Sequence, residues 1–165
     1  MKTQILDNEQ VKKIIKRMAF QVYETFIDEK ELVISAIDGN GVQYAKLLIK
    51  EIEGISKLKL HFLIVSLNKK TPNEDQISLS DTKLDLKNKS VLLVDDVLNT
   101  GRTLLYSSLP FLKAKVKRLK TAVLVDRNHK EFPVAADFIG LSLSTTLKEH
   151  VSVEIENKKI NVYLK

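Results

Sequence analysis

The chain has 165 residues, 27 of them basic and 21 acidic, and it contains no cysteine and no tryptophan. Its length suits one domain with one core, since domains usually have about 100–200 residues. The hydrophobic share of 44% and the charged share of 29% are typical of a soluble globular protein and exclude a chain that is disordered throughout. Without cysteine the chain can form no disulfide, no thiolate zinc site and no thiol nucleophile.

Short apolar runs exclude a membrane span. The longest strictly apolar runs have about four residues, at 62–65, 91–94 and 122–125, whereas a bilayer requires about 20. The first ten residues lack the hydrophobic segment of a secretory signal, so we expect a cytoplasmic protein with no membrane partner. The net charge of +6 favours anionic partners such as phosphates, nucleotides or nucleic acid, although a solvated lysine-rich surface explains the charge equally well.

The first third of the chain alternates helix and strand patterns. Apolar residues recur at helical spacing over 11–26, and Asp7 with Gln10 three residues later matches a capping box at the start of this helix. A short apolar run at 32–37 predicts a strand, and the apolar positions of 42–52 predict a second helix. The residues between them therefore join the end of a strand to the start of a helix.

A long polar connection follows. Residues 58–67 predict a strand, whereas 68–89 is polar, carries charges of both signs and includes Pro72. A connection of this length inside a compact domain is usually functional or disordered, so we expect a mobile loop here.

The rest of the chain continues the alternation. Residues 90–95 form an apolar run that ends in acids, the pattern of a strand buried on both faces of a parallel sheet. A helix is predicted from about Gly101, with Pro110 expected to kink or interrupt it. Further strands are predicted at 119–125, 138–141, 151–155 and 160–164, with a hairpin turn at 157–159. This order predicts an α/β fold whose ligands bind at the C-terminal ends of parallel strands.

The segment 91–103 carries the chemistry. Its buried strand brings two adjacent carboxylates, Asp95 and Asp96, to one end of the sheet, and a short loop with Thr100 and Gly101 leads into a helix. Free amide groups at a helix start bind anions, and carboxylates accept hydrogen bonds from the hydroxyls of a sugar. The loop can therefore bind a ribose 5-phosphate. An ordinary strand end with a helix-capping turn, or a Mg²⁺-binding phosphotransfer site, would leave a similar pattern.

Two stretches resemble a known family. Residues 95–103, Asp-Asp-Val-Leu-Asn-Thr-Gly-Arg-Thr, resemble the signature with which type I phosphoribosyltransferases bind phosphoribosyl pyrophosphate (PRPP). Residues 122–140 are similar to the pyrimidine operon regulators, members of this family that are also uracil phosphoribosyltransferases. The resemblance extends from about Ile5 to the C-terminus.

The resemblance implies a fold and a reaction. It implies a single phosphoribosyltransferase domain over 1–165, with a parallel sheet flanked by helices, a mobile loop at about 68–89 and a small C-terminal hood at about 127–165. The reaction would transfer ribose 5-phosphate from PRPP to a nucleobase, a pyrimidine such as uracil. Mg²⁺ would be held through PRPP rather than directly by the chain, and the protein would be a homo-oligomer.

The resemblance also assigns roles to residues. Asp95 and Asp96 would hold the ribose hydroxyls, and a closing loop within 68–77 would carry Lys69 and Lys70. The 5-phosphate would be bound by Leu98, Asn99, Thr100, Gly101, Arg102 and Thr103. The pyrophosphate would lie at the turn of Asp38, Gly39, Asn40 and Gly41. The nucleobase would lie beside Asp126, Arg127, Phe138 and Ile139, the last two from the hood.

One departure from the regulators and one contrast with purine-salvage members bear on function. Asp38 and Asn40 stand where the regulators carry basic residues, which predicts weaker pyrophosphate binding. Asn99 stands where purine-salvage members carry an acid that serves the purine ring, so a pyrimidine fits better, although a turn conformation alone would also explain an asparagine. The alternative function is therefore a PRPP- or nucleotide-sensing regulator that binds RNA and has weak or no catalysis.

Two groups of basic residues are candidate RNA-binding sites. Lys16 and Arg17 lie where the regulators carry polar and basic residues, yet Phe20 stands where they carry a histidine. The second group, a run that is more often a solvated face, comprises Lys113, Lys115, Lys117, Arg118 and Lys120. No metal-ligand spacing is seen for His61, His129 and His150.

Overall fold

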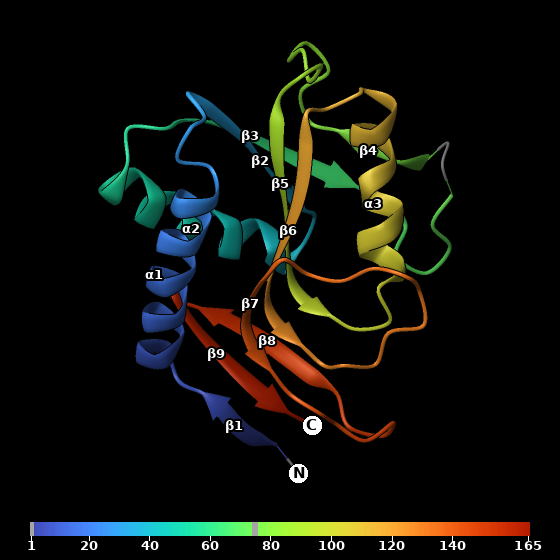
Figure 1. Ribbon diagram of the computed structural model, residues 1–165. Helices are drawn as coiled ribbons and strands as arrows, with labels where there is room; N and C mark the ends of the chain where they lie inside the picture. Colours follow the sequence, from blue (N-terminus) through green and yellow to red (C-terminus); the bar gives the residue numbers. More distant parts are fainter. Residues whose placement is uncertain (1, 74–75) are drawn as a thin grey trace.

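The computed structural model describes residues 2–73 and 76–165, whose arrangement is shown in Figure 1. In chain order the elements are β1 (Thr3–Leu6), α1 (Asn8–Thr25), β2 (Glu31–Ile37), α2 (Asn40–Ile55), β3 (Lys59–Ser66), β4 (Ser78–Leu79), β5 (Ser90–Leu98), α3 (Arg102–Lys113), β6 (Arg118–Asp126), β7 (Phe138–Ser142), β8 (Val151–Glu156) and β9 (Lys159–Leu164). Six strands form a central sheet in the order β4-β3-β2-β5-β6-β7, and all neighbours are parallel except β3 and β4. The α/β fold with a parallel sheet flanked by helices is confirmed.

Helices cover both faces of the central sheet, with α1 and α2 on one side and α3 on the other (Figure 1). Strand β5 contributes to both cores because successive side chains of a strand point to opposite faces. Leu92 and Val94 belong to the core under α1 and α2, whereas Val91 and Leu93 belong to the core under α3, and all four are fully buried. The prediction of a strand buried on both faces is therefore confirmed.

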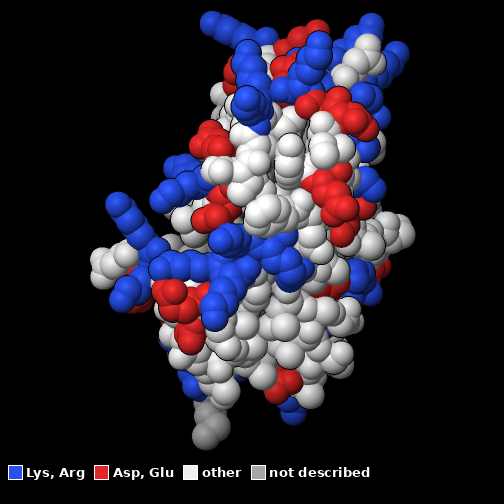
Figure 2. Space-filling model, turned by 60° about the vertical axis from the view of Figure 1, so that its left-hand side comes forward, with Lys and Arg blue, Asp and Glu red and all other residues white. Residues whose placement is uncertain are grey.

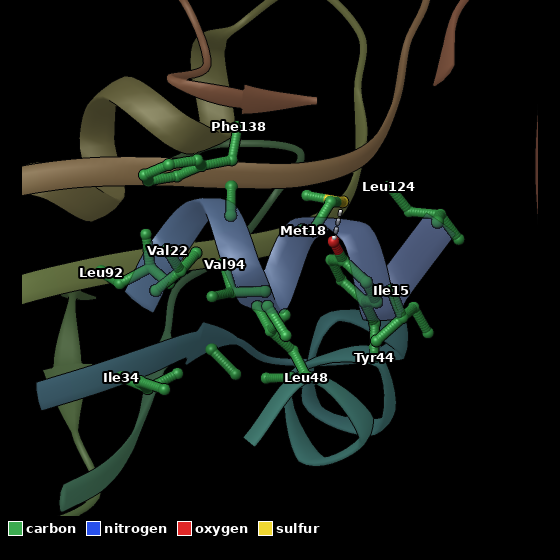
Figure 3. Packing of buried hydrophobic residues seen from close by; sticks show 14 of the residues in the cluster. Ile15, Met18, Val22, Ile34, Tyr44, Leu48, Leu92, Val94, Leu124 and Phe138 are labelled. Atoms are coloured by element: carbon green, nitrogen blue, oxygen red, sulfur yellow. Dashed lines mark hydrogen bonds between the residues drawn. The ribbon is translucent and has the colours of Figure 1, made fainter. Parts of the chain in front are cut away.

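The larger core holds α2 against the sheet (Figure 3). Within it the fully buried Tyr44 of α2 donates a hydrogen bond from its hydroxyl to the Met18 sulfur of α1 at 3.0 Å. This bond partners a polar group that would otherwise be costly to bury. Burial raises the pKa of the Tyr44 phenol, so the hydroxyl stays neutral.

Local sequence signals set the helix ends. The Asp7 carboxylate accepts from the Gln10 N–H at 2.8 Å, and the Gln10 side chain accepts from the Asp7 N–H at 2.9 Å, so the predicted capping box is confirmed. Pro110 does not interrupt α3, which runs on to Lys113. Because this proline lies in the last turn, its missing N–H removes a hydrogen bond only near the end of the helix.

A second, three-stranded antiparallel sheet has the order β1-β9-β8. The predicted hairpin joins β8 and β9 through Asn157 and Lys158, whose φ angles of 49° and 65° suit a two-residue turn. The small sheet differs from the expected C-terminal hood in two ways. It includes β1 from the N-terminus, which the sequence patterns did not predict, and it leaves out β7, which extends the central sheet.

The connection 68–89 is only partly an open loop. Residues 78–79 form β4 beside β3, and Leu86 is buried in the core under α3. The candidate closing loop, 68–77, includes residues 74 and 75, which lie outside the described residues. In the part of the chain that the structure describes, no helix is both long enough and apolar enough to cross a membrane.

Candidate functional site

A pocket of about 390 Å³ opens between the C-terminal end of β5 and strand β8 of the small sheet. Its volume is in the range of small-molecule sites, about 300–1,000 Å³. Of the residues that sequence reasoning singled out, those lining the pocket are Asn40, Lys69, Asp95, Asp96, Leu98, Asn99, Thr100, Gly101, Thr103 and Arg127. Segments distant in the sequence thus meet around one cavity.

The acid pair lies within β5 rather than after it. The strand was predicted to end at Asp95, but it continues through both acids to Leu98, because β6 pairs with it as far as Asp126. Asp95 is 5% exposed, and its Oδ1 accepts from the Asp96 N–H at 2.9 Å. Burial raises the pKa of the Asp95 carboxyl well above its usual range, and the neighbouring Asp96 carboxylate raises it further. A ligand that offers hydroxyl donors here would stabilise the ionised pair.

Two helices begin at the pocket without a side-chain cap. The N-caps of α2 and α3 are Gly39 and Gly101, neither of which has a capping side chain, in contrast to the capping box of α1. At α3 the Thr100 hydroxyl accepts only a long hydrogen bond, 3.3 Å, from the Arg102 N–H. The first N–H groups of a helix have no partner within the helix, and the helix dipole makes this end positive. The two ends can therefore bind two anionic groups.

Close backbone approaches require glycine at these helix starts. A Cβ at Gly41 would lie 3.2 Å from Asp95 Oδ1, so the first turn of α2 packs directly against Asp95. Gly101 has a φ of 86°, and a Cβ there would lie 2.4 Å from a methyl group of Val134. The segment that carries Val134 is fixed over this loop by the N–H groups of Glu131 and Phe132, which donate to the Thr100 carbonyl at 2.8 and 3.1 Å.

The turn 38–41 presents less negative charge to the pocket than its sequence suggests. The Asp38 carboxylate accepts from the Gly39 N–H at 2.9 Å and from the Ser66 hydroxyl at 3.3 Å, and only Asn40 of this turn lines the pocket. Lys69 also lines the pocket, and its Nζ lies 3.6 Å from where a Gly39 Cβ would be. The charged side chains that line the pocket beside this turn are thus Lys69 and Asp95, and Asp38 is not among them.

On the opposite flank Arg127 connects three segments. Its Nη1 donates to Asn99 Oδ1 at 2.8 Å, and its Nε and Nη2 donate to the Thr145 hydroxyl, both at 3.2 Å. Nη2 also donates to the main-chain carbonyl of Glu149. Asp126, by contrast, does not line the pocket, because its carboxylate is held by Lys130 Nζ and by a main-chain N–H.

Other predicted site residues lie elsewhere. Phe138 and Ile139 were expected to reach the nucleobase from a hood, but they lie on β7 of the central sheet and pack into its two cores. Phe138 packs into the core under α1 and α2, and neither Phe138 nor Ile139 lines the pocket, although Ile139 pairs with the pocket residue Val123. Arg102 lies in a neighbouring depression, and Lys70 does not line the pocket.

One wall of the pocket was not foreseen. It comprises His150, Val151, Ser152 and Val153 of β8 and the residue before it. The Asn40 amide donates to the Val153 carbonyl at 2.9 Å and so joins the start of α2 to β8. The alternation of 151–155 predicts the strand, but no local signal places it beside α2.

The acid pair also bears on metal binding. Within the described residues no group of three or more His, Cys, Asp or Glu side chains comes together to hold a metal ion. Mg²⁺ commonly binds through one or two carboxylates together with the phosphates of a ligand. Asp95 and Asp96 fit that role, with most of the coordination left to the ligand and water.

Comparisons with known proteins agree with this geometry. The family model of the phosphoribosyl transferase domain matches residues 1–158. Relatives named "Bifunctional protein PyrR" include one from Haemophilus ducreyi, 32% identical over 93% of this chain and 89% of that protein. Another, from Bacillus pumilus, is 32% identical over 99% of this chain and 98% of that protein. The crystal structure of the Trypanosoma cruzi hypoxanthine phosphoribosyltransferase has the same fold, with a TM-score of 0.78 and 17% identity over 97% of this chain and 95% of that chain. The chain therefore belongs to the phosphoribosyltransferase family.

Proposed function

We propose that the protein transfers ribose 5-phosphate from PRPP to a pyrimidine nucleobase, with uracil as the acceptor. The observation that carries this proposal is the pairing of two uncapped helix starts with a carboxylate pair in one pocket. PRPP has the matching groups, since two phosphate-bearing ends flank a ribose with free hydroxyls. A simple phosphate site would need neither the second helix start nor the acids.

Each part of PRPP has its own partner in this proposal. The N–H groups at the start of α3 and the Thr100 and Thr103 hydroxyls bind the 5-phosphate. Asp95 and Asp96 accept hydrogen bonds from the ribose hydroxyls. The start of α2 and the Lys69 ammonium bind the pyrophosphate.

The same arrangement favours the transfer step. As the bond between the anomeric carbon and pyrophosphate breaks, positive charge develops on the ribose, and fixed carboxylates beside it stabilise that charge. Mg²⁺ bound to PRPP would neutralise the departing pyrophosphate. The described part of the candidate closing loop, 68–73 and 76–77, would cover the pocket and exclude water that could hydrolyse the ribosyl cation.

Two observations favour a pyrimidine. The relatives named "Bifunctional protein PyrR" match nearly the whole chain, and the sequence resembles regulators that are also uracil phosphoribosyltransferases. Asn99 supplies an amide where purine-salvage members carry an acid.

A steady-state assay of pyrophosphate release with PRPP, Mg²⁺ and a panel of nucleobases tests the proposal. We expect turnover with uracil and little with hypoxanthine, and no turnover with any base would overturn the assignment.

Lys69 gives a prediction about the pyrophosphate end. We expect Lys69→Met to raise the Kd for PRPP about tenfold, because a charge-assisted hydrogen bond contributes about 1.5–3 kcal/mol before solvent screening. Binding of UMP, which has no pyrophosphate, should change less than twofold. Calorimetric titration of both ligands measures the difference. The control is Lys57→Met, which removes the same charge from the exposed connection before β3. An equal loss for UMP, or the same loss in the control, would refute a pyrophosphate contact.

A second candidate function, RNA binding, rests on the α1–α2 face. Figure 2 shows Lys and Arg side chains gathered on this side of the molecule. A groove between α1 and α2 is lined by four lysines, Lys12, Lys13, Lys16 and Lys50, together with Glu9 and Glu51. Arg17 does not line this groove, and its Nη2 donates to the carbonyls of Ile139 and Gly140 on β7. In the run 113–120, Lys117 and Arg118 pair with Glu29, and Lys120 pairs with Asp137.

Gel shifts at two salt concentrations test this second function. Phosphate contacts make affinity fall steeply as salt rises, whereas specific recognition adds a preference over a scrambled RNA of equal length. Lys12→Glu with Lys16→Glu should weaken binding if the groove holds RNA. Equal affinity for the scrambled RNA would dismiss specific recognition.

A further inference from the structure

The segment from Glu149 to Val153 crosses one side of the pocket and is tied at both ends. The main-chain carbonyl of Glu149 accepts a hydrogen bond from Arg127 Nη2, and that of Val153 accepts one from the Asn40 amide at 2.9 Å. Between these two ties, residues 150–152 all line the pocket. The wall formed by β8 and the residue before it is thus held by Arg127 on one flank and by the start of α2 on the other.

The pairing of β8 with β9 shows which main-chain groups face the pocket. His150 and Lys165 exchange both of their main-chain hydrogen bonds, at 2.8 and 2.9 Å, and therefore form a hydrogen-bonded pair of the antiparallel ladder. Hydrogen-bonded and non-hydrogen-bonded pairs alternate along such a ladder, so Val151 and Val153 direct their N–H and C=O groups away from β9. The bond from Asn40 to the Val153 carbonyl agrees with this register. Since β8 is an edge strand of the small sheet, the groups of Val151 on this outer edge of β8 point toward the pocket that it lines.

The outer edge of β8 suits a nucleobase. The Val151 N–H can donate a hydrogen bond, and the Val151 C=O can accept one. The lactam edge of uracil, which is a ring N–H beside a carbonyl, offers the complementary acceptor and donor. In the proposed function the two helix starts and the acid pair bind the phosphates and the ribose, which leaves the walls formed by β8 and Asn99 for the nucleobase.

Asn40 lies where the phosphate and ribose parts of the pocket meet β8. It is the first residue of α2, and the glycines on either side of it mark its surroundings. A Cβ at Gly39 would lie 3.6 Å from Lys69 Nζ, and one at Gly41 would lie 3.2 Å from Asp95 Oδ1. In the proposed function Lys69 binds the pyrophosphate and Asp95 binds the ribose. The Asn40 amide is neutral and donates to β8, so it links these groups to the β8 wall and adds no charge to the pyrophosphate site.

We propose, resting on the proposed function, that Asn40 is a positioning residue through which pyrophosphate at the start of α2 and a nucleobase at the outer edge of β8 strengthen each other's binding. A ligand that fixes the start of α2 also fixes β8 through the bond to the Val153 carbonyl. The nucleobase then meets a wall that is already ordered, at a smaller cost in conformational entropy. Because binding free energies are linked, a bound nucleobase strengthens pyrophosphate binding by the same factor.

Calorimetric titration of pyrophosphate with Mg²⁺ tests this proposal, first with the protein alone and then with the protein saturated with pseudouridine 5′-monophosphate. This nucleotide carries the uracil ring on a carbon–carbon glycosidic bond that pyrophosphate cannot break, so both ligands stay bound without reaction. The ratio of the two Kd values is the coupling between the ligands. We expect the bound nucleotide to lower the Kd for pyrophosphate about fivefold, which is the effect of one net hydrogen bond. Saturating ribose 5-phosphate, which lacks the base, should change this Kd less than about twofold.

Two variants separate positioning from structure. Asn40→Ala removes the amide but keeps the main-chain N–H at the start of α2, so the coupling should fall below about twofold, while the Kd for pyrophosphate without nucleotide stays within about twofold of the wild type. With saturating PRPP, the KM for uracil should rise about fivefold with kcat retained. The matched control is Asn161→Ala, since Asn161 accepts from Gln4 Nε2 at 3.3 Å within the small sheet and does not line the pocket. This control should keep the wild-type coupling.

The outcomes distinguish this proposal from the function on which it rests. If both ligands bind but the wild type shows no coupling, or if Asn40→Ala keeps the coupling, the proposal is overturned and the transferase assignment stays intact. An equal loss of coupling in Asn161→Ala also overturns it, because the integrity of the small sheet would then set the coupling. Asn40 is exposed, so Asn40→Ala should unfold at the wild-type Tm. No turnover with any nucleobase overturns both proposals.

Discussion

Asp95→Asn should lower kcat/KM for PRPP by about 10²- to 10³-fold while making the folded protein more stable. The loss of activity follows because a preorganised charge beside a developing ribosyl cation contributes on that order. The gain in stability follows because the native site buries this carboxyl beside Asp96, at a cost that an amide does not incur. We expect the free energy of unfolding to rise by about 0.5–2 kcal/mol, the size common for relieving a strained functional site.

The pH dependence of stability gives the same prediction a second readout. The pKa of Asp95 is raised in the folded state, so above the ordinary aspartate pKa of about 4 the unfolded chain releases this proton first. The Asp95 contribution to wild-type stability should therefore decline as pH rises from about 4 toward the folded-state pKa, and Asp95→Asn should lack that decline. Urea unfolding at several pH values measures the free energy of unfolding of the wild type and of Asp95→Asn.

A matched variant controls for the loss of one negative charge. Asp81 is exposed, and among the described residues its carboxylate accepts a local N–H, from Lys83 at 2.8 Å. Asp81→Asn should leave kcat/KM within about twofold and should not stabilise the protein at any pH. If Asp95→Asn were fully active, or if it were less stable than the wild type at pH 8, the assignment of a buried functional carboxylate would be wrong.

Sequence reasoning succeeded where the structure is decided locally. The capping box of Asp7 and Gln10 lies within three residues, and the hairpin turn at Asn157 and Lys158 lies between two strands that are adjacent in the sequence. The buried strand β5 was also recognised, because burial on both faces leaves a continuous apolar run. Strand β1 was missed because its partner β9 lies at the other end of the chain, where Thr3 pairs with Leu164.

The candidate site shows the same division. The segment 95–103 could be singled out because its acids, threonines and glycine lie within nine consecutive residues. Asp38 was interpreted from its charge alone, but its carboxylate binds Gly39 and Ser66 instead of facing the pocket. Phe138 was expected in the hood because its register beside β6 depends on a pairing with Ala122 that no local pattern reveals. Side-chain direction and strand pairing were thus the missing information.

Gly140→Ala should destabilise the fold more than any surface change. A Cβ at this position on β7 would lie 2.4 Å from the Leu124 carbonyl oxygen and 2.8 Å from a methyl group of Ile14 on α1. The carbonyl belongs to the backbone of β6, so it cannot move aside as a flexible side chain could. Arg17 of α1 also donates to the Gly140 carbonyl at 2.7 Å, so a displaced β7 would lose this bond as well. We expect a loss of about 2–4 kcal/mol of unfolding free energy.

The control is the same substitution at Gly54 in α2, where an added Cβ would meet no atom within 4 Å. Alanine is the better helix former, so Gly54→Ala should stabilise the protein by about 0.5–1 kcal/mol. Thermal unfolding distinguishes Gly140→Ala from Gly54→Ala, since a change of 1 kcal/mol in the free energy of unfolding shifts the Tm by roughly 2–4 °C in a chain of this size. A Tm for Gly140→Ala equal to that of the wild type would mean that α1 and β7 can separate at little cost. The close crossing of α1 over β7 would then not be what holds α1 against the edge of the sheet.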